Sequence, residues 1–387
     1  MKAHLKSIMY MVIAGVLFWL FLPAKYTINM PFQFANSASE KELLERLEIT
    51  EGFTLSVHAD NLSGVRALVV TDTNDIITSR PNIGTLTLVY RDADNDGRSD
   101  GHKLLLKGLN KPHGIAIHKG WLYIAETDAV LRIKYDAEER RFIGTPHYII
   151  RNSFPGGGNH WSRSLKIGPD NKLYISAGSS CNVCIESTAT RASILQYDLD
   201  GKNEVVFASG LRNTVGFDWS PDTRQLFGVD NGRDFLGENR PPEELNLIQK
   251  GQHYGWPYEH GSNNPDPEFS SKKPSSITTT PPVHEFTAHS APLSLLFIQH
   301  NKALLGSALI ALHGSWNRSK KSGYKIVKLT FDANGSVTQH NFLTGFELDD
   351  NVIGRPVDLT EDIHGNIYLS DDYSGKIYKL TLTKITY

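Results

Sequence analysis

The stretch HGIAIHKGWLYIAETDAVLRI, from His113 to Ile133, decides the fold of this chain. A short apolar strand leads, a polar turn follows, and two further apolar runs come after it, which is the pattern of neighbouring antiparallel strands. The same three-stranded unit recurs as RALVVTDTNDIITSR from Arg66, SLKIGPDNKLYISAG from Ser164, GFDWSPDTRQLFGVDNG from Gly216, PLSLLFIQHNKALLGSALIALHG from Pro292 and VDLTEDIHGNIYLSDDYSGKIYKL from Val357. Because no single unit can bury its own faces, six units predict an all-β fold, a six-bladed β-propeller. A β-sandwich could use the same strands, but it would need far fewer of them.

The composition excludes several classes of protein. Forty Lys and Arg residues against 42 Asp and Glu residues give a net charge of −2 over 387 residues, so no nucleic acid is expected as a partner. A hydrophobic content of 40% with 10% aromatics supports a large core and excludes wholesale disorder. Two cysteines are too few for a disulfide-dense scaffold or a four-thiolate zinc site.

The first forty residues differ from the rest of the chain. Lys2 and Lys6 precede an uncharged, largely apolar run from Ser7 to Ala24, which is the order of an export signal and also the lower length limit of a membrane span. We therefore expect residues 1–38 to be an export signal or an N-terminal membrane anchor plus spacer, and residues 39–387 to form the propeller. The lysines favour a body outside the inner membrane, in the periplasm or another extracytoplasmic space.

Two shorter segments complete the outline. EKELLERLEI, from Glu40 to Ile49, predicts a short helix before the first strand. The polar, Pro- and Ser-rich stretch from His260 to Pro282 predicts a long loop between strands, not a linker between domains.

A glycine-rich loop, PGGGNHWSRSL from Pro155 to Leu165, places His160 just before a predicted strand. In a propeller such loops line the mouth of the central channel, where an imidazole can accept a proton near neutral pH. The alternative is a surface histidine that only forms hydrogen bonds.

Two further loops carry groups suited to ligands. In GLRNTVGFDWSP, Arg212 and Asn213 suit an anionic or carbonyl-rich ligand, although Arg212 could instead form an ion pair between blades. In DNGRDFLGENRPPEELN, the turn at Gly232 and Arg233 could offer main-chain carbonyls to a hard cation, or could be an ordinary loop.

An acidic turn resembles the start of an EF-hand calcium loop. Asp92, Asp94, Asp96 and Asp100 alternate around a glycine, but the twelfth position is Lys103 and no flanking helices are predicted. The turn is therefore either a structural Ca²⁺ site or a solvated acidic loop.

The pair Cys181 and Cys184 has the spacing of a catalytic dithiol or of half a haem attachment site. Ile185 breaks the haem pattern, and no thioredoxin-like βαβ unit surrounds the pair. We favour a short structural disulfide in an oxidising compartment.

The ordered series HWSRSLKIGPDNKLYISAG, CNVC, GLRNTVGFDWSP, DNGRDFLGENRPPEELN, GQHYGWPY, HGSWNRS and GRPVDL resembles the sorbosone dehydrogenase family, relatives of the soluble quinoprotein glucose dehydrogenases. The resemblance extends from about Leu47 to Leu382 and is most specific between Gly210 and Tyr258.

This resemblance implies a propeller that holds pyrroloquinoline quinone and an adjacent Ca²⁺ at the channel mouth. It implies that His160 is the general base, that Arg212 and Asn213 contact the quinone, and that the backbone of Gly232 and Arg233 holds the calcium. Arg212 would also stabilise charge that develops on the quinone oxygens.

The resemblance also implies roles for four further residues. Arg355 would point toward the cofactor carboxylates, and Asn159 stands where the glucose enzymes carry an Asp that assists the base. The lysine that grips the cofactor in those enzymes has no clean counterpart, and Arg318 and Lys325 are candidates for its role.

The implied activity is oxidation of a sugar or a sugar-derived aldehyde or alcohol, of the sorbosone or aldose type. Its partners would be a small sugar and an electron acceptor, either a quinone or a cytochrome. No GxGxxG motif links a strand to a helix, which disfavours a nicotinamide enzyme. The alternatives are a calcium-dependent propeller lactonase and a non-catalytic propeller that binds a carbohydrate or a protein.

Overall fold

The computed structural model describes residues 38–155 and 157–383. The predicted signal or anchor lies outside this part of the chain, apart from its last residue. None of the helices among the described residues is long and apolar enough to span a membrane.

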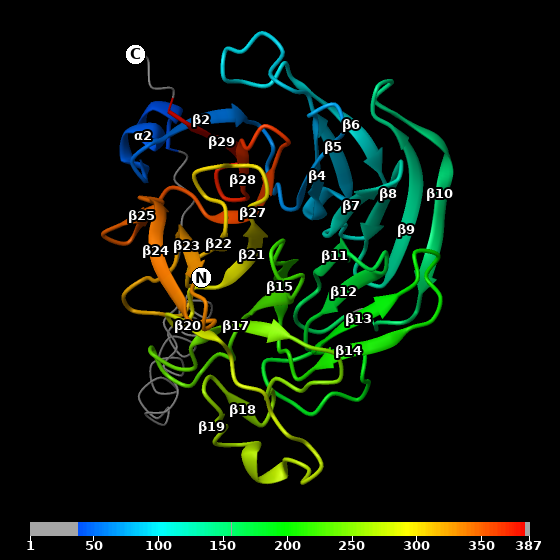
Figure 1. Ribbon diagram of the computed structural model, residues 1–387, viewed down its shortest axis with the longest axis vertical. Helices are drawn as coiled ribbons and strands as arrows, with labels where there is room; N and C mark the ends of the chain where they lie inside the picture. Colours follow the sequence, from blue (N-terminus) through cyan, green and yellow to red (C-terminus); the bar gives the residue numbers. More distant parts are fainter. Residues whose placement is uncertain (1–37, 156, 384–387) are drawn as a thin grey trace, which may run out of the picture.

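Six antiparallel sheets surround a central axis and confirm the six-bladed propeller (Figure 1). The strands of each blade, given from the axis outward, are as follows: blade 1, β3 (Leu68–Val70), β4 (Ile76–Arg80), β5 (Thr85–Val89) and β6 (His102–Lys107); blade 2, β7 (Ile115–His118), β8 (Trp121–Ala125), β9 (Ala129–Asp136) and β10 (Arg141–Arg151); blade 3, β11 (Arg163–Ile167), β12 (Leu173–Ala177), β13 (Ser193–Tyr197) and β14 (Val205–Ser209); blade 4, β15 (Thr214–Trp219), β16 (Leu226–Asp230), β17 (Glu243–Ile248) and β20 (His284–Phe286); blade 5, β21 (Pro292–Phe297), β22 (Ser307–Leu312), β23 (Lys325–Phe331) and β24 (Val337–Thr344); blade 6, β27 (Pro356–Glu361), β28 (Ile367–Asp371), β29 (Lys376–Leu382) and β2 (Phe53–Ala59).

Each blade has at least four strands where the sequence pattern predicted three. The outermost strands are less buried than the second strands: β6 has only exposed and half-buried positions, and β10 has one buried residue in eleven. Strands that cover little core lack the apolar runs by which a strand is recognised in the sequence.

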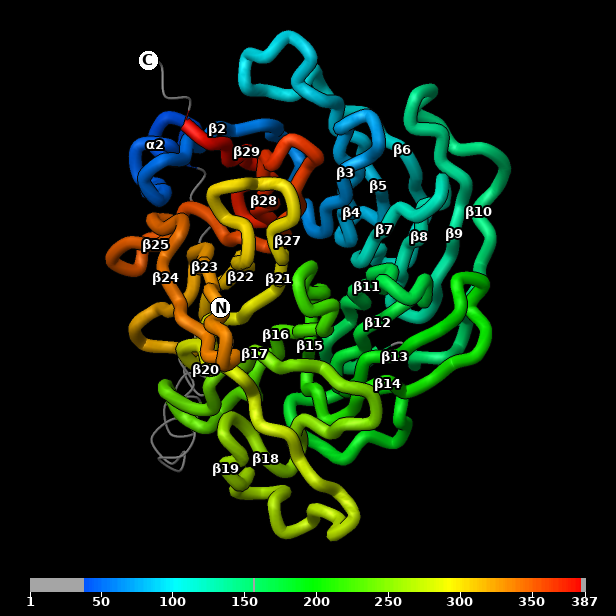
Figure 2. Tube along the Cα trace, viewed as in Figure 1, coloured from blue at the N-terminus to red at the C-terminus, as the bar shows by residue number. Residues whose placement is uncertain are grey.

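The N-terminal strand closes the ring. β2 pairs with β29, with Phe53 opposite Leu382, so blade 6 is built from both ends of the described chain, which Figure 2 shows as blue beside red. The predicted helix is present as α2 (Glu40–Arg46), and Ser39 caps it by accepting a hydrogen bond from the Glu42 amide. The last residues of the helical pattern instead form β1 (Glu48–Ile49), which adds a fifth strand to blade 5.

The core is divided among the gaps between neighbouring blades. Between blades 4 and 5, for example, the rings of Phe227, Phe297 and Phe331 lie 5.4 to 5.5 Å apart within one buried cluster. Aromatic contacts of this kind stabilise beyond the area they bury. The first strands of all six blades leave a central channel with a cavity of about 730 Å³.

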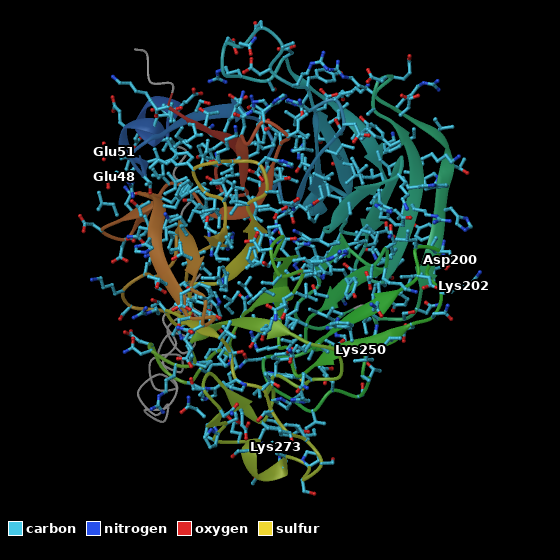
Figure 3. All side chains as sticks on the ribbon, in the orientation of Figure 1. Glu48, Glu51, Asp200, Lys202, Lys250 and Lys273 are labelled. Atoms are coloured by element: carbon cyan, nitrogen blue, oxygen red, sulfur yellow. A yellow bond between two sulfur atoms is a disulfide. The ribbon has the colours of Figure 1, made fainter. Side chains whose placement is uncertain are left out.

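The polar stretch after His260 is a loop between strands, as predicted. β17 pairs directly with β20, and the intervening chain forms the hairpin of β18 (Glu259–His260) and β19 (Asn264–Pro265) beyond the outer edge of blade 4. Charged side chains occupy the outer turns: Lys202 pairs with Asp200, and Lys273 pairs with Glu259 (Figure 3).

Candidate active site

Residues one to three positions before the inner strands gather at one end of the channel. Each inner strand begins at this end, so the residues just before it lie around the channel axis. We call the set the entrance ring: Arg66, His113, His160, Asn213 and Arg355. Contacts connect its neighbours, since the His313 carbonyl accepts from Arg355 and Asp372 binds both His313 and Arg66.

His160 is oriented by a backbone carbonyl. Its Nδ1 lies 2.9 Å from the carbonyl oxygen of Ser179 and 3.0 Å from the Ser179 hydroxyl, which itself donates to the Cys181 carbonyl. A carbonyl can only accept, so Nδ1 carries the proton and Nε2 keeps its lone pair. Within the described part of the chain, no hydrogen bond engages Nε2. The structure therefore presents His160 as a proton acceptor at the channel entrance.

Two buried arginines hold the loop that carries His160. Arg163 donates to the His160 carbonyl at 2.8 Å, and Arg191 donates to the carbonyls of Asn159 and Ser179 at 3.1 Å each. These contacts support the positive φ of +49° at His160, a backbone conformation that side chains rarely adopt. Neither arginine is among the site residues predicted from the sequence. In the sequence, Arg163 is the first residue of β11 and Arg191 lies two residues before β13, which is a weak signal for a functional role.

The surroundings of His160 favour its neutral form. Burial, followed by the charges of Arg212 and Arg191, lowers the pKa of His160 from 6.5 to about 3. An imidazole with this pKa is unprotonated at neutral pH, so it is available as a base without prior loss of a proton.

Gly178 allows His160 and Asn213 to approach each other. A Cβ atom at Gly178 would collide with Asn213 Oδ1 and would lie 2.8 Å from the Cβ of His160. Asp230 fixes the Asn213 backbone by accepting from its amide at 2.8 Å, and it also accepts from Thr214 Oγ1 at 2.8 Å. The Asn213 side-chain amide has no hydrogen bond to any described residue and is available to a ligand.

Arg212 has a different role from the one predicted. Its guanidinium donates to the carbonyls of Asn182, Asn231 and Gly232, to the side chain of Asn182 and, at 3.5 Å, toward Asp234. These contacts use all five donors and join a loop of blade 3 to a loop of blade 4. The alternative of a contact between blades therefore describes this side chain better than a direct contact with a ligand.

The predicted calcium carbonyl is already engaged. The Gly232 carbonyl accepts from Arg212 at 2.7 Å, and the Gly232 amide donates to Glu243 at 2.6 Å. The side chain of Arg233 pairs with Asp266 and Glu268. A metal ion at Gly232 would have to share this carbonyl with the Arg212 guanidinium, whose positive charge disfavours a cation there.

Buried carboxyl groups lie behind this turn. Burial raises the pKa of Glu243 and of Glu244 to about 8 and that of Asp230 to about 6. The two glutamates begin β17 and accept backbone N–H groups of Gly232 and Gly261. They hold loops in place and do not face the channel as metal ligands.

The disulfide loop supports the same region. Cys181 and Cys184 are bonded to each other, and Asn182 between them accepts from Arg212 and from the Asp234 amide. Ser179, which orients His160, immediately precedes this loop. The disulfide loop therefore supports His160 in two ways. The Cys181 carbonyl accepts a hydrogen bond from Ser179, and Asn182 accepts one from Arg212.

The remaining predicted residues are distributed as follows. Arg355 is half-buried and donates to the His313 and Gly314 carbonyls. Asn159 is exposed, Arg318 donates to Asn239, and Lys325 donates to Asn341 near the outer strand β24. Lys325 therefore lies away from the entrance ring.

The acidic turn lies elsewhere. Asp92, Asp94, Asp96 and Asp100 belong to the β5–β6 hairpin loop. Because β5 runs in the same direction as β3, that loop is at the opposite end of blade 1 from the entrance ring.

Residues 47–267 and 263–383 match the model of the TrAA12-like family. The chain belongs to this family. An uncharacterised protein from Borreliella burgdorferi is 36% identical to this TrAA12-like chain over 297 residues, covering 73% of the chain and 78% of that protein. The pyrroloquinoline quinone-dependent sugar dehydrogenase of Hypocrea jecorina is 23% identical over 419 residues, covering 90% and 94%.

Solved structures share the fold. The calcium structure of the Trichoderma reesei family AA12 enzyme superposes with a TM-score of 0.75 at 22% identity, covering 87% of this chain and 97% of that one. The holo pyranose dehydrogenase PQQ domain from Coprinopsis cinerea gives a TM-score of 0.73 at 20% identity, covering 86% and 96%.

Proposed function

We propose that this TrAA12-like protein is a pyrroloquinoline quinone-dependent dehydrogenase that oxidises a sugar, or an alcohol or aldehyde derived from one. The observation that carries the proposal is His160, whose Nδ1 is fixed by the Ser179 carbonyl while Nε2 remains free at the channel entrance. The quinone dependence of the Hypocrea jecorina relative supports the choice of cofactor.

The charges around His160 fit an anionic cofactor. Arg163, Arg191 and Arg355 form no ion pair with a carboxylate in residues 38–155 and 157–383, and burial lowers the pKa of Arg163 to about 9. Buried cations without a counter-charge are unfavourable, so an anion at the entrance would stabilise them. A tricarboxylated quinone meets that need, with Arg355 and the free Asn213 amide as its direct donors.

The bound quinone would supply the acceptor for the hydride equivalent that leaves the substrate carbon. His160 Nε2 would take the proton of the substrate hydroxyl, because its lone pair is unused and its imidazole is neutral. Arg163 and Arg191 would keep the loop, and therefore Nε2, in place. Asn213 and Arg355 would bind and orient the anion beside the base.

We do not extend the proposal to calcium at the entrance. The Trichoderma reesei structure that contains calcium supports a role for this ion in the family. In this chain Arg212 already supplies positive charge at the Gly232 carbonyl, so the present arrangement does not fit a metal there. The chemistry assigned to His160 does not depend on such an ion.

The lactonase alternative needs carboxylates and amides that converge on one ion in the channel. Among the described residues, only two groups of three His, Cys, Asp or Glu side chains come together. One includes the disulfide, and the other is the acidic turn at the opposite end of blade 1. No observation favours hydrolysis or a solely binding role over oxidation.

The setting of the reaction is also part of the proposal. The N-terminal pattern supports a body outside the inner membrane, and the cysteine pair suits an oxidising compartment. A membrane quinone or a cytochrome would then receive the electrons.

The test uses the purified full-length chain, freed of metal and mixed with pyrroloquinoline quinone. Calcium, magnesium or chelator is added in parallel samples, and dye reduction is measured with a panel of aldoses, sugar alcohols and lactones. We expect quinone binding, seen in its absorbance, and dye reduction with at least one sugar. Absence of quinone binding in all samples, or lactone hydrolysis without dye reduction, would overturn the proposal.

A further inference from the structure

We propose that the acidic loop between β5 and β6 binds Ca²⁺ and that this ion fastens the seam where the propeller ring closes. The site is independent of the quinone site, which lies at the other end of the channel axis.

Three carboxylates of the loop converge. Ligand oxygens of Asp92, Asp94 and Asp100 all lie within 4.8 Å of one another. Ca²⁺ takes six to eight oxygen ligands at about 2.3–2.6 Å, so oxygens at this separation can share one ion. Hard oxygen ligands without nitrogen or sulfur favour Ca²⁺ or Mg²⁺ over transition metals.

An independent sign of a missing ligand comes from Asp92. Its side chain is only 4% exposed, and its Oδ1 is buried without a hydrogen-bond partner. The other oxygen, Oδ2, accepts from the Gly97 amide and from Lys379 Nζ, each at 3.1 Å. A buried carboxylate oxygen without a partner is costly, and a cation beside Oδ1 would remove that cost.

The backbone of the loop has the shape that such an ion requires. Gly97 has φ of +95°, and it occupies the position where a calcium loop of this spacing turns sharply. Arg98, one residue later, offers its carbonyl at the position that supplies a main-chain ligand in such loops. Lys103 at the twelfth position lies near the Tyr90 ring and supplies no carboxylate. Because the loop lacks this bidentate ligand, its dissociation constant for Ca²⁺ should lie in the range of extracellular calcium modules, about 10⁻⁴–10⁻³ M.

The loop contacts every element of the closing seam. The Ser99 amide donates to the His58 carbonyl on β2 at 2.8 Å, and Lys379 on β29 binds Asp92. Arg98 pairs with Glu40 of α2. An ion that orders this loop would therefore tie blade 1 to the two strands that close blade 6.

The experiment titrates Ca²⁺ into metal-free, quinone-free full-length protein and records calorimetric binding, the melting temperature and amide exchange in β2. At a calcium concentration about 100 times Kd, the equilibrium constant for opening of the seam should fall about 100-fold. The variants Asp94→Asn and Asp100→Asn change exposed side chains and should abolish binding, the rise in melting temperature and the extra protection of β2.

Asp332→Asn is the matched control, since Asp332 is an exposed turn residue that also accepts backbone amides. It should keep the full calcium response. Equal responses in wild type and both loop variants would place the ion elsewhere, and binding without added protection of β2 would refute the link to closure. Either result overturns the proposal.

Discussion

The carbonyl oxygen of Ser179 lies 2.9 Å from Nδ1 of His160. The group that sets the tautomer of the proposed base is thus part of the main chain, and no side-chain substitution can remove it. Its position depends on the strand that ends at Ala177 and on the disulfide loop that follows. The role of His160 can therefore be tested in three ways: by replacing the residue itself, by replacing a residue that packs against it, and by changing a charge that sets its pKa.

Replacing the base should stop turnover without releasing the cofactor. His160→Ala should lower the rate of dye reduction about 10²–10⁴-fold, which is the usual effect of losing a general base. Quinone absorbance should still show binding, because the anion is held mainly by arginine and amide groups. His147→Ala, on the exposed strand β10, is the control. Near-wild-type turnover of His160→Ala at saturating quinone would contradict the mechanism.

Gly178→Ala should damage the site by steric pressure. The added methyl group would collide with Asn213 Oδ1 and press on His160, so turnover and quinone affinity should both fall. Gly168→Ala is the matched control, because its methyl group would meet Asp170 Oδ1 at 2.6 Å at the opposite end of blade 3. Both variants should lose about 1–3 kcal/mol of stability, but only Gly178→Ala should lose function in the steady-state assay.

The charge of Arg191 should help to keep His160 neutral. In cofactor-free protein, NMR titration of the His160 ring should show no protonation between pH 7 and pH 5, since its pKa is lowered to about 3. Arg191→Met removes a nearby positive charge and should raise the pKa, whereas Arg191→Lys keeps the charge while losing the hydrogen bonds to the loop. Titration of the wild-type ring near pH 6.5 would contradict the assigned environment.

His113 should make the fold sensitive to acid. Burial, followed by the charges of Arg66 and Arg163, lowers its pKa from 6.5 to about 3. Between these two pKa values, His113 is protonated in the unfolded chain but not in the folded chain. The free energy of unfolding therefore decreases as the pH is lowered through this window, by up to about 1.4 kcal/mol per pH unit. His113→Phe should flatten that slope in denaturant titrations at pH 4 to 6. The slopes should coincide above pH 7, and equal slopes at acid pH would contradict this role.

The predicted export can be tested with reporter fusions. Alkaline phosphatase joined after residue 40 should be active if the N-terminal segment directs the body outward, because the reporter folds only in an oxidising space. A fusion that lacks residues 1–24 should be inactive and serves as the control. An inactive full-length fusion would refute the proposed location.

Much of the architecture follows from the sequence because the second strand of each blade is buried at nearly every position. Strands such as β12 and β22 are buried throughout and appear as continuous apolar runs, so the six repeats are visible. His160 could also be predicted from the sequence, because a histidine that follows three glycines on a loop before a strand is unusual.

The supporting contacts could not be predicted in the same way. Arg163 and Arg191 act on backbone carbonyls that the fold brings to them, and no residue pattern marks such an acceptor. Arg212 was predicted to face a ligand, yet its donors meet loops of two different blades. Pairing of that kind depends on how neighbouring blades dock, which a local pattern does not specify.

The pairing of β2 with β29 has a consequence for how the chain reaches its native state. Thr54 and Thr381, whose hydroxyl groups lie 2.8 Å apart across this pair, are 327 residues apart in sequence. Contacts of such long range form slowly, because the entropy of closing the intervening loop must be overcome first. During synthesis, β2 emerges early and must wait, as an unpaired strand edge, until almost the whole chain has been made. Aggregation and chaperone dependence should therefore be concentrated in this first strand, and a circular permutant that begins at β3 and ends with β2 should fold faster than the natural chain order.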